Sequence, residues 1–186
     1  MPVLGIVASQ ISGHLFAPSG AYDSIATVTV GTAQSTITFS SIPATYTHLQ
    51  VRYISNNTVN AYYINCRFNG DSGSNYAAHE LSGSGTAASA SGAASQTSFQ
   101  FPRSSSGASS ALIFAGGVVD ILDYANTNKY KTTRGLGGYD ANGSGAVDFE
   151  SGLWMNTAAI TSIVLSSATG NFAQYSSFAL YGIRGN

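Results

Sequence analysis

The chain has 186 residues, of which 44% are hydrophobic and only 8% are charged. Soluble domains usually carry roughly 25% charged residues, so the polar surface of this chain must be mainly uncharged. A formal net charge of −1, with only 7 Lys and Arg residues, excludes tight binding along a nucleic-acid backbone. A single cysteine, Cys66, excludes a disulfide framework and a cysteine-rich metal site. No apolar run approaches the roughly 20 residues that a membrane-spanning helix needs.

The low charge also favours self-association. A free monomer uses charged side chains to stay soluble and to protect the edges of its sheets from pairing with other chains. A chain that is rich in hydrophobic residues and poor in charge is better protected when partner subunits cover part of its surface. We therefore expect a homo-oligomer.

The first 22 residues precede the regular strand pattern and contain a group of seven apolar side chains. They are Val3, Leu4, Ile6, Val7, Ile11, Leu15 and Phe16. Two interpretations remain open: an additional first strand that packs on the core, or an arm that binds a partner. The second makes these seven residues an assembly interface, and residues 23–186 then form a single domain.

Residues Ile25–Val30 and Gln34–Phe39 alternate between apolar and polar side chains, which predicts two strands. Gly31–Ala33 between them is typical of a short hairpin turn, so we expect the two strands to pair. Thr47–Ser55 and Tyr62–Phe68 show the clearest pattern of strands with one buried face.

These two strands predict one shared core and two outward arginines, Arg52 and Arg67. The side chains expected in the core alternate with polar ones along each strand. They are Leu49, Val51, Tyr53, Tyr62, Ile64, Cys66 and Phe68.

Seven further short strands are predicted, with turn-rich connections and no helical pattern between them. They cover Thr97–Phe101, Ala111–Phe114, Val118–Leu122, Lys129–Leu136, Ala146–Met155, Ser162–Leu165 and Ser177–Ile183. About ten short strands in one domain indicate an all-β fold, an antiparallel β-sandwich of the jelly-roll kind. The Ser/Gly/Ala-rich stretch 82–98 is typical of a surface loop.

Candidate chemistry is sparse. Asp140–Gly145 matches the first half of a calcium-binding loop, but Ser151 stands where the last ligand, a glutamate, belongs, so a hairpin turn is favoured. Asp148 and Glu150 share one strand face at about 7 Å, a spacing compatible with an inverting glycosidase. Neither the Asp140–Gly145 loop nor the Asp148 and Glu150 pair has clustered His or Cys residues near it in the sequence. We expect no enzyme, no metal and no cofactor.

Several stretches resemble a broad group of small all-β virion proteins of tailed bacteriophages, and the resemblance covers nearly the whole chain. The stretches are Ser24–Gly31, Phe39–Ile54 (FSSIPATYTHLQVRYI), Arg67–Gly85, Asp120–Asp140, Ser151–Leu165 and Phe178–Gly185. The resemblance implies a virion protein that is assembled in the cytoplasm of the host bacterium. It implies no catalytic residues.

Composition and resemblance together predict a non-enzymatic structural protein. The first expectation is a capsid decoration, or cement, protein that forms a homotrimer on the major capsid protein and stabilises the head. The alternative is a tail-fibre or baseplate module that recognises glycans on the host surface. Other virion proteins are the expected partners, and neither nucleic acid nor a membrane is expected.

Overall fold

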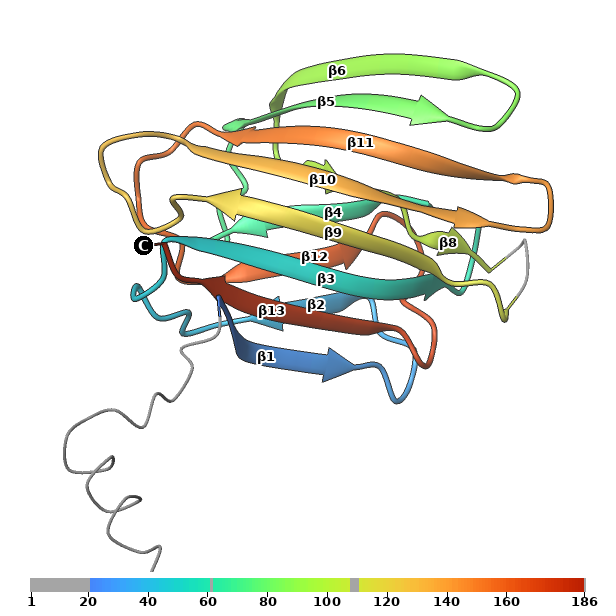
Figure 1. Cartoon of the computed structure of the whole chain (residues 1–186), viewed down its shortest axis with the longest axis horizontal. Helices are drawn as coiled ribbons and strands as arrows, with labels where there is room; N and C mark the ends of the chain where they lie inside the picture. Colours follow the sequence, from blue (N-terminus) through green and yellow to red (C-terminus); the bar gives the residue numbers. More distant parts are fainter. Residues whose placement is uncertain (1–20, 61, 108–110, 186) are drawn as a thin grey trace, which may run out of the picture.

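The computed structural model describes residues 21–60, 62–107 and 111–185. These residues form thirteen strands in two sheets that pack face to face (Figure 1). The all-β antiparallel sandwich expected from the sequence is confirmed, whereas its jelly-roll form stays a prediction. The described residues include no helix long and apolar enough to cross a membrane.

The larger sheet has nine strands, eight of which follow one another in the order β1–β13–β3–β9–β10–β11–β5–β6. Their neighbours are all antiparallel, and the ninth strand, β8 (Ser105–Ser106), pairs with β3 in parallel. The bounds in that order are β1 Tyr22–Thr29, β13 Ser177–Ile183, β3 His48–Asn57, β9 Ala115–Leu122, β10 Lys131–Asp140, β11 Gly145–Trp154, β5 Tyr76–Gly83 and β6 Ala88–Gln96.

The smaller sheet covers one face of the larger one. Its order is β2 (Thr36–Phe39), β12 (Ile163–Ser167), β4 (Ile64–Phe68) and β7 (Phe99–Phe101). Strand β7, at one edge of this sheet, lies against β5 and β11 of the larger sheet. The face of the larger sheet that is turned toward the smaller one is called the inner face here, and the opposite face the outer face.

The core lies between the sheets, and β3 of the larger sheet and β4 of the smaller one both bury alternate residues in it. Six of the seven predicted core residues are buried, namely Leu49, Val51, Tyr53, Ile64, Cys66 and Phe68. Arg52 and Arg67 are exposed, as predicted. Tyr62 is the exception: it precedes β4, is half-buried and stacks on Tyr139 at 6.2 Å between ring centroids.

The predicted hairpin at Gly31–Ala33 is wrong. Strand β1 pairs with β13 in the larger sheet, whereas β2 pairs with β12 in the smaller one. The connection therefore crosses from one layer to the other. Crossing lets the apolar face of each strand meet the core from opposite sides, which burial of Val30, Ile37 and Phe39 reflects.

The Ser/Gly/Ala-rich stretch 82–98, expected as a loop, instead completes β5 and forms β6. Every residue of β6 is exposed, so no apolar side chain holds it in place. Its backbone pairs with β5. A tight turn connects the two strands, and in it Gly85 has a positive φ of 86°. The strand predicted at Ala111–Phe114 is wrong, since these residues form no strand. Strand β9 (Ala115–Leu122) instead extends the strand predicted at Val118–Leu122.

Candidate functional site

Strand β11 turns its acidic residues toward the inner face, and its last residue, Trp154, fixes this orientation. Trp154 is 1% exposed, and its indole Nε1 donates to Oδ2 of Asp71 at 2.8 Å. The register with β10 runs without a bulge from Trp154 to Gly145, so every second residue before Trp154 faces inward. Two of these inward residues are Asp148 and Glu150, both buried. The sequence correctly places the two acids on one face, and the structure shows that this face is the inner one.

Arg103 lies beneath the two acids because the chain after β7 is held against β10. Pro102 packs on Gly135 and Gly137, where an added Cβ would lie only 2.7 Å from the proline ring. The Tyr53 hydroxyl, reaching from β3, donates to the carbonyl oxygen of Pro102. Only glycine at these two positions of β10 lets the Pro102 ring approach so closely.

The Arg103 guanidinium forms a two-pronged ion pair with Asp148. Its Nε and Nη2 donate to the two carboxylate oxygens, the second at 2.8 Å, and Nη2 also lies 3.3 Å from Oε1 of Glu80 on β5. Ser82 Oγ donates to Asp148 at 2.8 Å. A buried carboxylate that is paired and hydrogen-bonded in this way is compensated for its lost hydration.

Glu150 is not compensated in the same way. It is 6% exposed, and its Oε2 atom is buried without a hydrogen-bond partner. Burial, followed by the negative charges of Glu80 and Asp148, raises the pKa of Glu150 to about 9, against the lowering effect of Arg103. Glu150 is therefore a neutral carboxylic acid at neutral pH.

A hollow of about 250 Å³ opens beside Glu150, where the β5–β6 hairpin extends past the edge strand β7 of the smaller sheet. We call it the β6–β7 hollow. Its lining combines polar side chains with small ones: Ala78, His79, Glu80, Ser91, Gly92, Ala93, Gln100 and Glu150.

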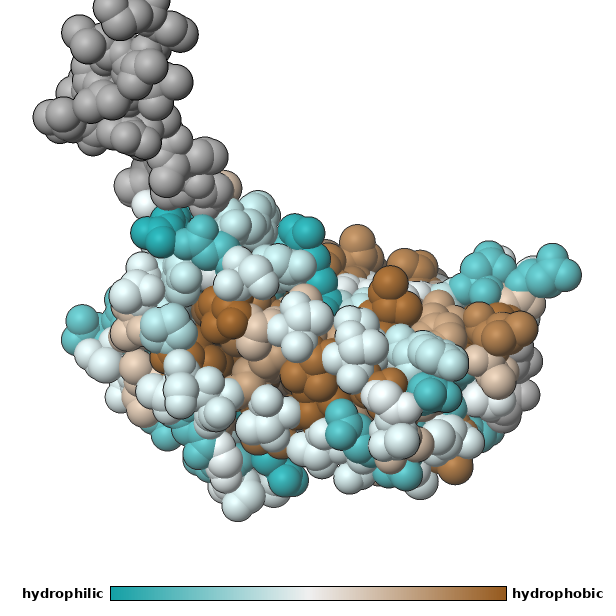
Figure 2. Space-filling view, turned by 90° about the horizontal axis from the view of Figure 1, so that it is seen from below, coloured by the Kyte–Doolittle hydropathy of each residue, from teal (hydrophilic) through white to brown (hydrophobic). Residues whose placement is uncertain are grey.

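The outer face presents the reverse pattern, with apolar side chains in the open. Leu81, Phe149, Leu136 and Val118 are direct cross-strand neighbours on β5, β11, β10 and β9. Together with Val147 they form a group that we call the outer apolar cluster. Four members, Leu81, Leu136, Val147 and Phe149, are between 49% and 56% exposed and surround an apolar hollow of about 330 Å³. Figure 2 looks onto the opposite edge of the larger sheet, at β1, where brown apolar residues lie among pale, weakly polar ones.

The part of the outer face beside the outer apolar cluster is polar. The Arg52 guanidinium lies 5.1 Å from the ring centroids of both Tyr22 and Tyr181, and its Nε donates to Gln50 at 2.6 Å. Gln50 in turn donates to Asp120 at 2.7 Å, and Arg134 lies 3.9 Å from the same carboxylate. On the outer face, this group of paired polar residues therefore borders the apolar cluster directly, with Arg52 opposite Val118.

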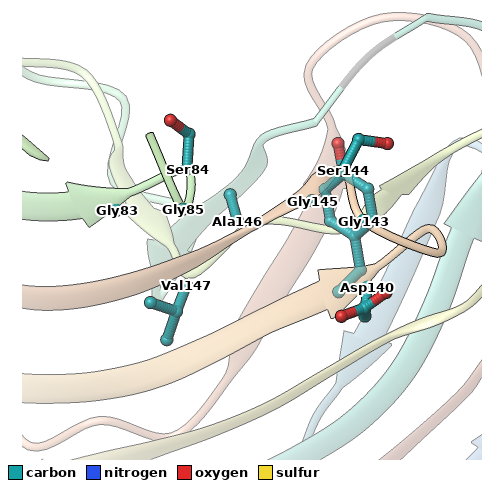
Figure 3. A pocket seen from close by; sticks show the side chains of 10 residues that line it. Gly83, Ser84, Gly85, Asp140, Gly143, Ser144, Gly145, Ala146 and Val147 are labelled. Atoms are coloured by element: carbon teal, nitrogen blue, oxygen red, sulfur yellow. The ribbon is translucent and has the colours of Figure 1, made fainter. Parts of the chain in front are cut away.

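The remaining predicted features have structural roles. In the Asp140–Gly145 turn, Oδ1 of Asp140 accepts from the Asn142 amide at 2.8 Å, as in a hairpin turn and not in a calcium loop. Figure 3 shows this turn beside residues Gly83–Gly85 at the end of β5, with a pocket between them that is lined mainly by small residues. Cys66 is fully buried, and burial raises the pKa of its thiol.

The basic residues Lys129 and Lys131 pair with neighbouring groups. Lys129 binds Asp123, and the buried Lys131 donates to the carbonyl oxygens of Asn126, Lys129 and Thr157 at 2.6–3.0 Å. Within the described parts of the chain, no group of three or more His, Cys, Asp or Glu side chains is arranged to hold a metal ion. The predicted assembly interface, residues Val3 to Phe16, lies outside the described residues.

The charged residues Glu80, Arg103, Asp148 and Glu150 on the inner face form a group that we call the inner cluster. The sequence did not indicate two of its members, Arg103 and Glu80. One signal was available: Arg103 is the single charged residue between Glu80 and Asp120. A lone charge in a long uncharged stretch needs a partner, and on an inner face that partner must be an acid.

The comparisons with known proteins assign the chain to no family. No family model matches the sequence, and no curated protein matches it. Among solved structures, a protein of unknown function from Shewanella oneidensis MR-1 is 11% identical, with 90% of this chain and 78% of that chain covered and a TM-score of 0.27. A likeness at this level carries no argument about function.

Proposed function

We propose that the chain is a non-enzymatic structural subunit of a tailed-bacteriophage virion, and that the outer face of its larger sheet binds another subunit. The first location we propose is the head exterior, where copies of the chain associate as a trimer and cover the major capsid protein. The resemblance of the sequence to virion proteins supports this role. The low charge of the chain supports assembly in general.

The single observation that carries the binding surface is the outer apolar cluster. Leucine, valine and phenylalanine side chains that stay half exposed on a sheet face are typical of a surface that a partner covers. The charged side chains beside this cluster, Arg52, Asp120 and Arg134, have partners of their own on the same face.

The free energy that this surface can contribute to binding favours a role in a multivalent assembly. Covering the exposed halves of the four most exposed cluster residues contributes roughly 3–6 kcal/mol. Association of two proteins costs roughly 4–15 kcal/mol in lost freedom, so one such contact alone is weak. Several subunits binding together, or further apolar contacts from the segment that contains Val3 to Phe16, would make the attachment stable.

The test compares matched outward substitutions on the same face. Phe149→Asn and Leu136→Asn remove apolar side chains from the outer apolar cluster, whereas Thr27→Asn changes an exposed residue of β1 at the far end of the same row. Light scattering measures the oligomer mass, and co-sedimentation measures binding to particles that lack this protein. We expect both cluster variants, and not Thr27→Asn, to reduce association by at least tenfold. Unchanged mass and binding in all three would refute the proposed surface.

Two further measurements separate head from tail and test the N-terminal residues. Hundreds of copies per virion agree with decoration, whereas about six to a few tens of copies would place the chain in the tail. Deleting residues 1–16 should leave a folded protein that fails to trimerise or to coat particles. Aggregation or a lost thermal transition would instead make this segment part of the core.

A further inference from the structure

We propose that the β6–β7 hollow binds a neutral ligand that carries several hydroxyl groups, such as a sugar residue or another polyol. This site is separate from the outer face, and it adds a recognition function to the proposed structural one.

The first support is the construction of the hollow. Glu80 and Glu150 are direct cross-strand neighbours on β5 and β11, so their carboxyl groups are presented side by side. Gln100 of β7 contributes an amide from the opposite sheet, and Ser91 of β6 contributes a hydroxyl. Donors and acceptors thus approach one small volume from four strands, which is the arrangement that orients a polar ligand.

The second support is the unpartnered atom of Glu150. A buried polar atom without a hydrogen bond is rare in folded proteins, because it forfeits its hydration without replacement. Glu150 lines the hollow, so a ligand hydroxyl bound there would lie next to this carboxyl group. Glu80 offers a complementary acceptor beside it.

Charge decides the class of ligand. With a pKa of about 9, ionised Glu150 is disfavoured roughly a hundredfold at pH 7, so an ammonium ligand would have to bind against that factor. Arg103 lies behind the acids and pairs with both Asp148 and Glu80, which leaves one net negative charge among these three groups. An anionic ligand would meet these same carboxylates. A neutral hydroxyl uses the protonated acid as it stands.

The groups that face Glu150 define its response to pH. They are Glu80 on β5, Asp148 on β11, Arg103 after β7 and the Tyr53 phenol on β3, whose own pKa is raised by burial and then by Glu150 and Asp148. As the pH rises through about 9, Glu150 ionises and loses its hydrogen-bond donor. Binding of a neutral polyol should weaken over that range.

The test is a titration followed by NMR on the full chain. Methyl α-glucoside and glycerol serve as neutral probes, and butylammonium and acetate as charged ones. We expect the neutral probes to give saturable shifts of the Ala78 and Ala93 methyl groups and of the Gln100 side-chain amide. Tighter binding of the glucoside would indicate a glycan ligand, and equal binding of glycerol a small free polyol.

Variants make the result specific. Glu150→Gln keeps a neutral donor and should preserve binding while removing its loss above pH 9. Glu150→Met removes the donor at similar volume and should weaken binding at least tenfold. Gln100→Ala tests the opposite wall without touching the charged cluster. Thermal unfolding of each variant checks that it is folded.

Three outcomes would overturn the inference. Neutral probes that leave the hollow's resonances unmoved up to their solubility would do so, as would equal binding by wild type and Glu150→Met. Saturable binding of butylammonium alone would make the hollow a cation site. None of these outcomes bears on subunit association, which is measured with the outer-face variants.

Discussion

Strands β3 and β11 belong to the same sheet and alternate equally well, yet they do so in opposite phase. In β3, Val51 and Tyr53 face the core and Arg52 faces solvent. In β11, Asp148 and Glu150 face the interior while Phe149 lies exposed. The comparison shows that alternation identifies a strand, whereas the buried face depends on what covers the strand and where it is anchored.

Strand β11 can turn acidic residues inward because the groups beneath it differ from those beneath β3. Strand β3 faces an aromatic and aliphatic core that includes Phe178 and Phe172, whose rings are tilted with their centroids 4.8 Å apart. Beneath the first half of β11 lies Arg103, with Ser82 and Glu80 beside it. Both proposed functional surfaces follow from this reversal, since it exposes the outer apolar cluster and leaves an acid facing the β6–β7 hollow.

The largest effect is expected from giving β3 an inward carboxylate such as β11 has. Val51→Asp should prevent folding, because a buried charge without an arginine partner costs several kcal/mol. Far-UV circular dichroism and thermal unfolding measure the result. Ile54→Asp, an outward position of the same strand that is exposed, is the matched control and should fold. A folded Val51→Asp protein with wild-type stability would show that the phase of β3 is not what positions the core.

Removing the arginine from β11 is expected to have the next largest effect. Arg103→Met should destabilise the protein by about 3–5 kcal/mol, because it leaves Asp148 buried and unpaired. Urea unfolding measures this loss. The triple variant Arg103→Met, Asp148→Asn, Glu80→Gln should recover much of it, since the remaining groups are then neutral. A single variant that loses less than about 1 kcal/mol would mean that the ion pair is not what permits the reversed phase.

The sequence predicts the strands well where alternation is reinforced by side-chain chemistry. Tyr62–Phe68 and Ser177–Ile183 combine β-branched or aromatic residues with clear polar alternation, and the structure has strands at both. Strand β6 escaped prediction because Ala, Ser and Gly have little strand preference, and only pairing with β5 forms it.

The inner cluster could not be predicted, because its members are brought together over long distances in the chain. Asp148 and Arg103 are 45 residues apart, and their contact depends on Pro102 resting on the two glycines of β10. The pair Asp148 and Glu150 was visible as a shared face, but its burial follows from Trp154, which anchors the far end of the strand. The hairpin error at Gly31–Ala33 has the same origin, since the partner β13 lies at the other end of the chain.

A substitution of Glu150 is expected to stabilise the protein, in contrast to the two destabilising substitutions above. Its pKa is raised from 4.5 to about 9 in the folded state, so the folded protein loses stability as the pH rises above 4.5, and the loss is complete near 9. Glu150→Gln stays neutral throughout this range. We expect the variant to be more stable than the wild type by at most about 3 kcal/mol at pH 7, and equal to it near pH 4. Urea unfolding of both proteins between pH 4 and 9 measures the difference. A constant difference across this range would contradict the burial of an ionisable Glu150.

The smallest effect is expected for the ion pair on the outer face of these strands. Arg134 and Asp120 carry the same charges as Arg103 and Asp148, but Arg134 is 61% exposed and 3.9 Å from its partner. Arg134→Gln should change stability by less than about 0.5 kcal/mol, because water solvates the charge that remains. Asp120 also keeps its hydrogen bond from Gln50 at 2.7 Å, so the substitution leaves no carboxylate without a partner. Urea unfolding in low and high salt measures the effect, with Arg103→Met as the buried counterpart. If Arg134→Gln costs more than about 1.5 kcal/mol, Arg52, Gln50, Asp120 and Arg134 act as one coupled network, and a double variant with Gln50→Ala would show non-additive losses. If the loss is small, burial and not the identity of the charged groups separates the two faces of the sheet.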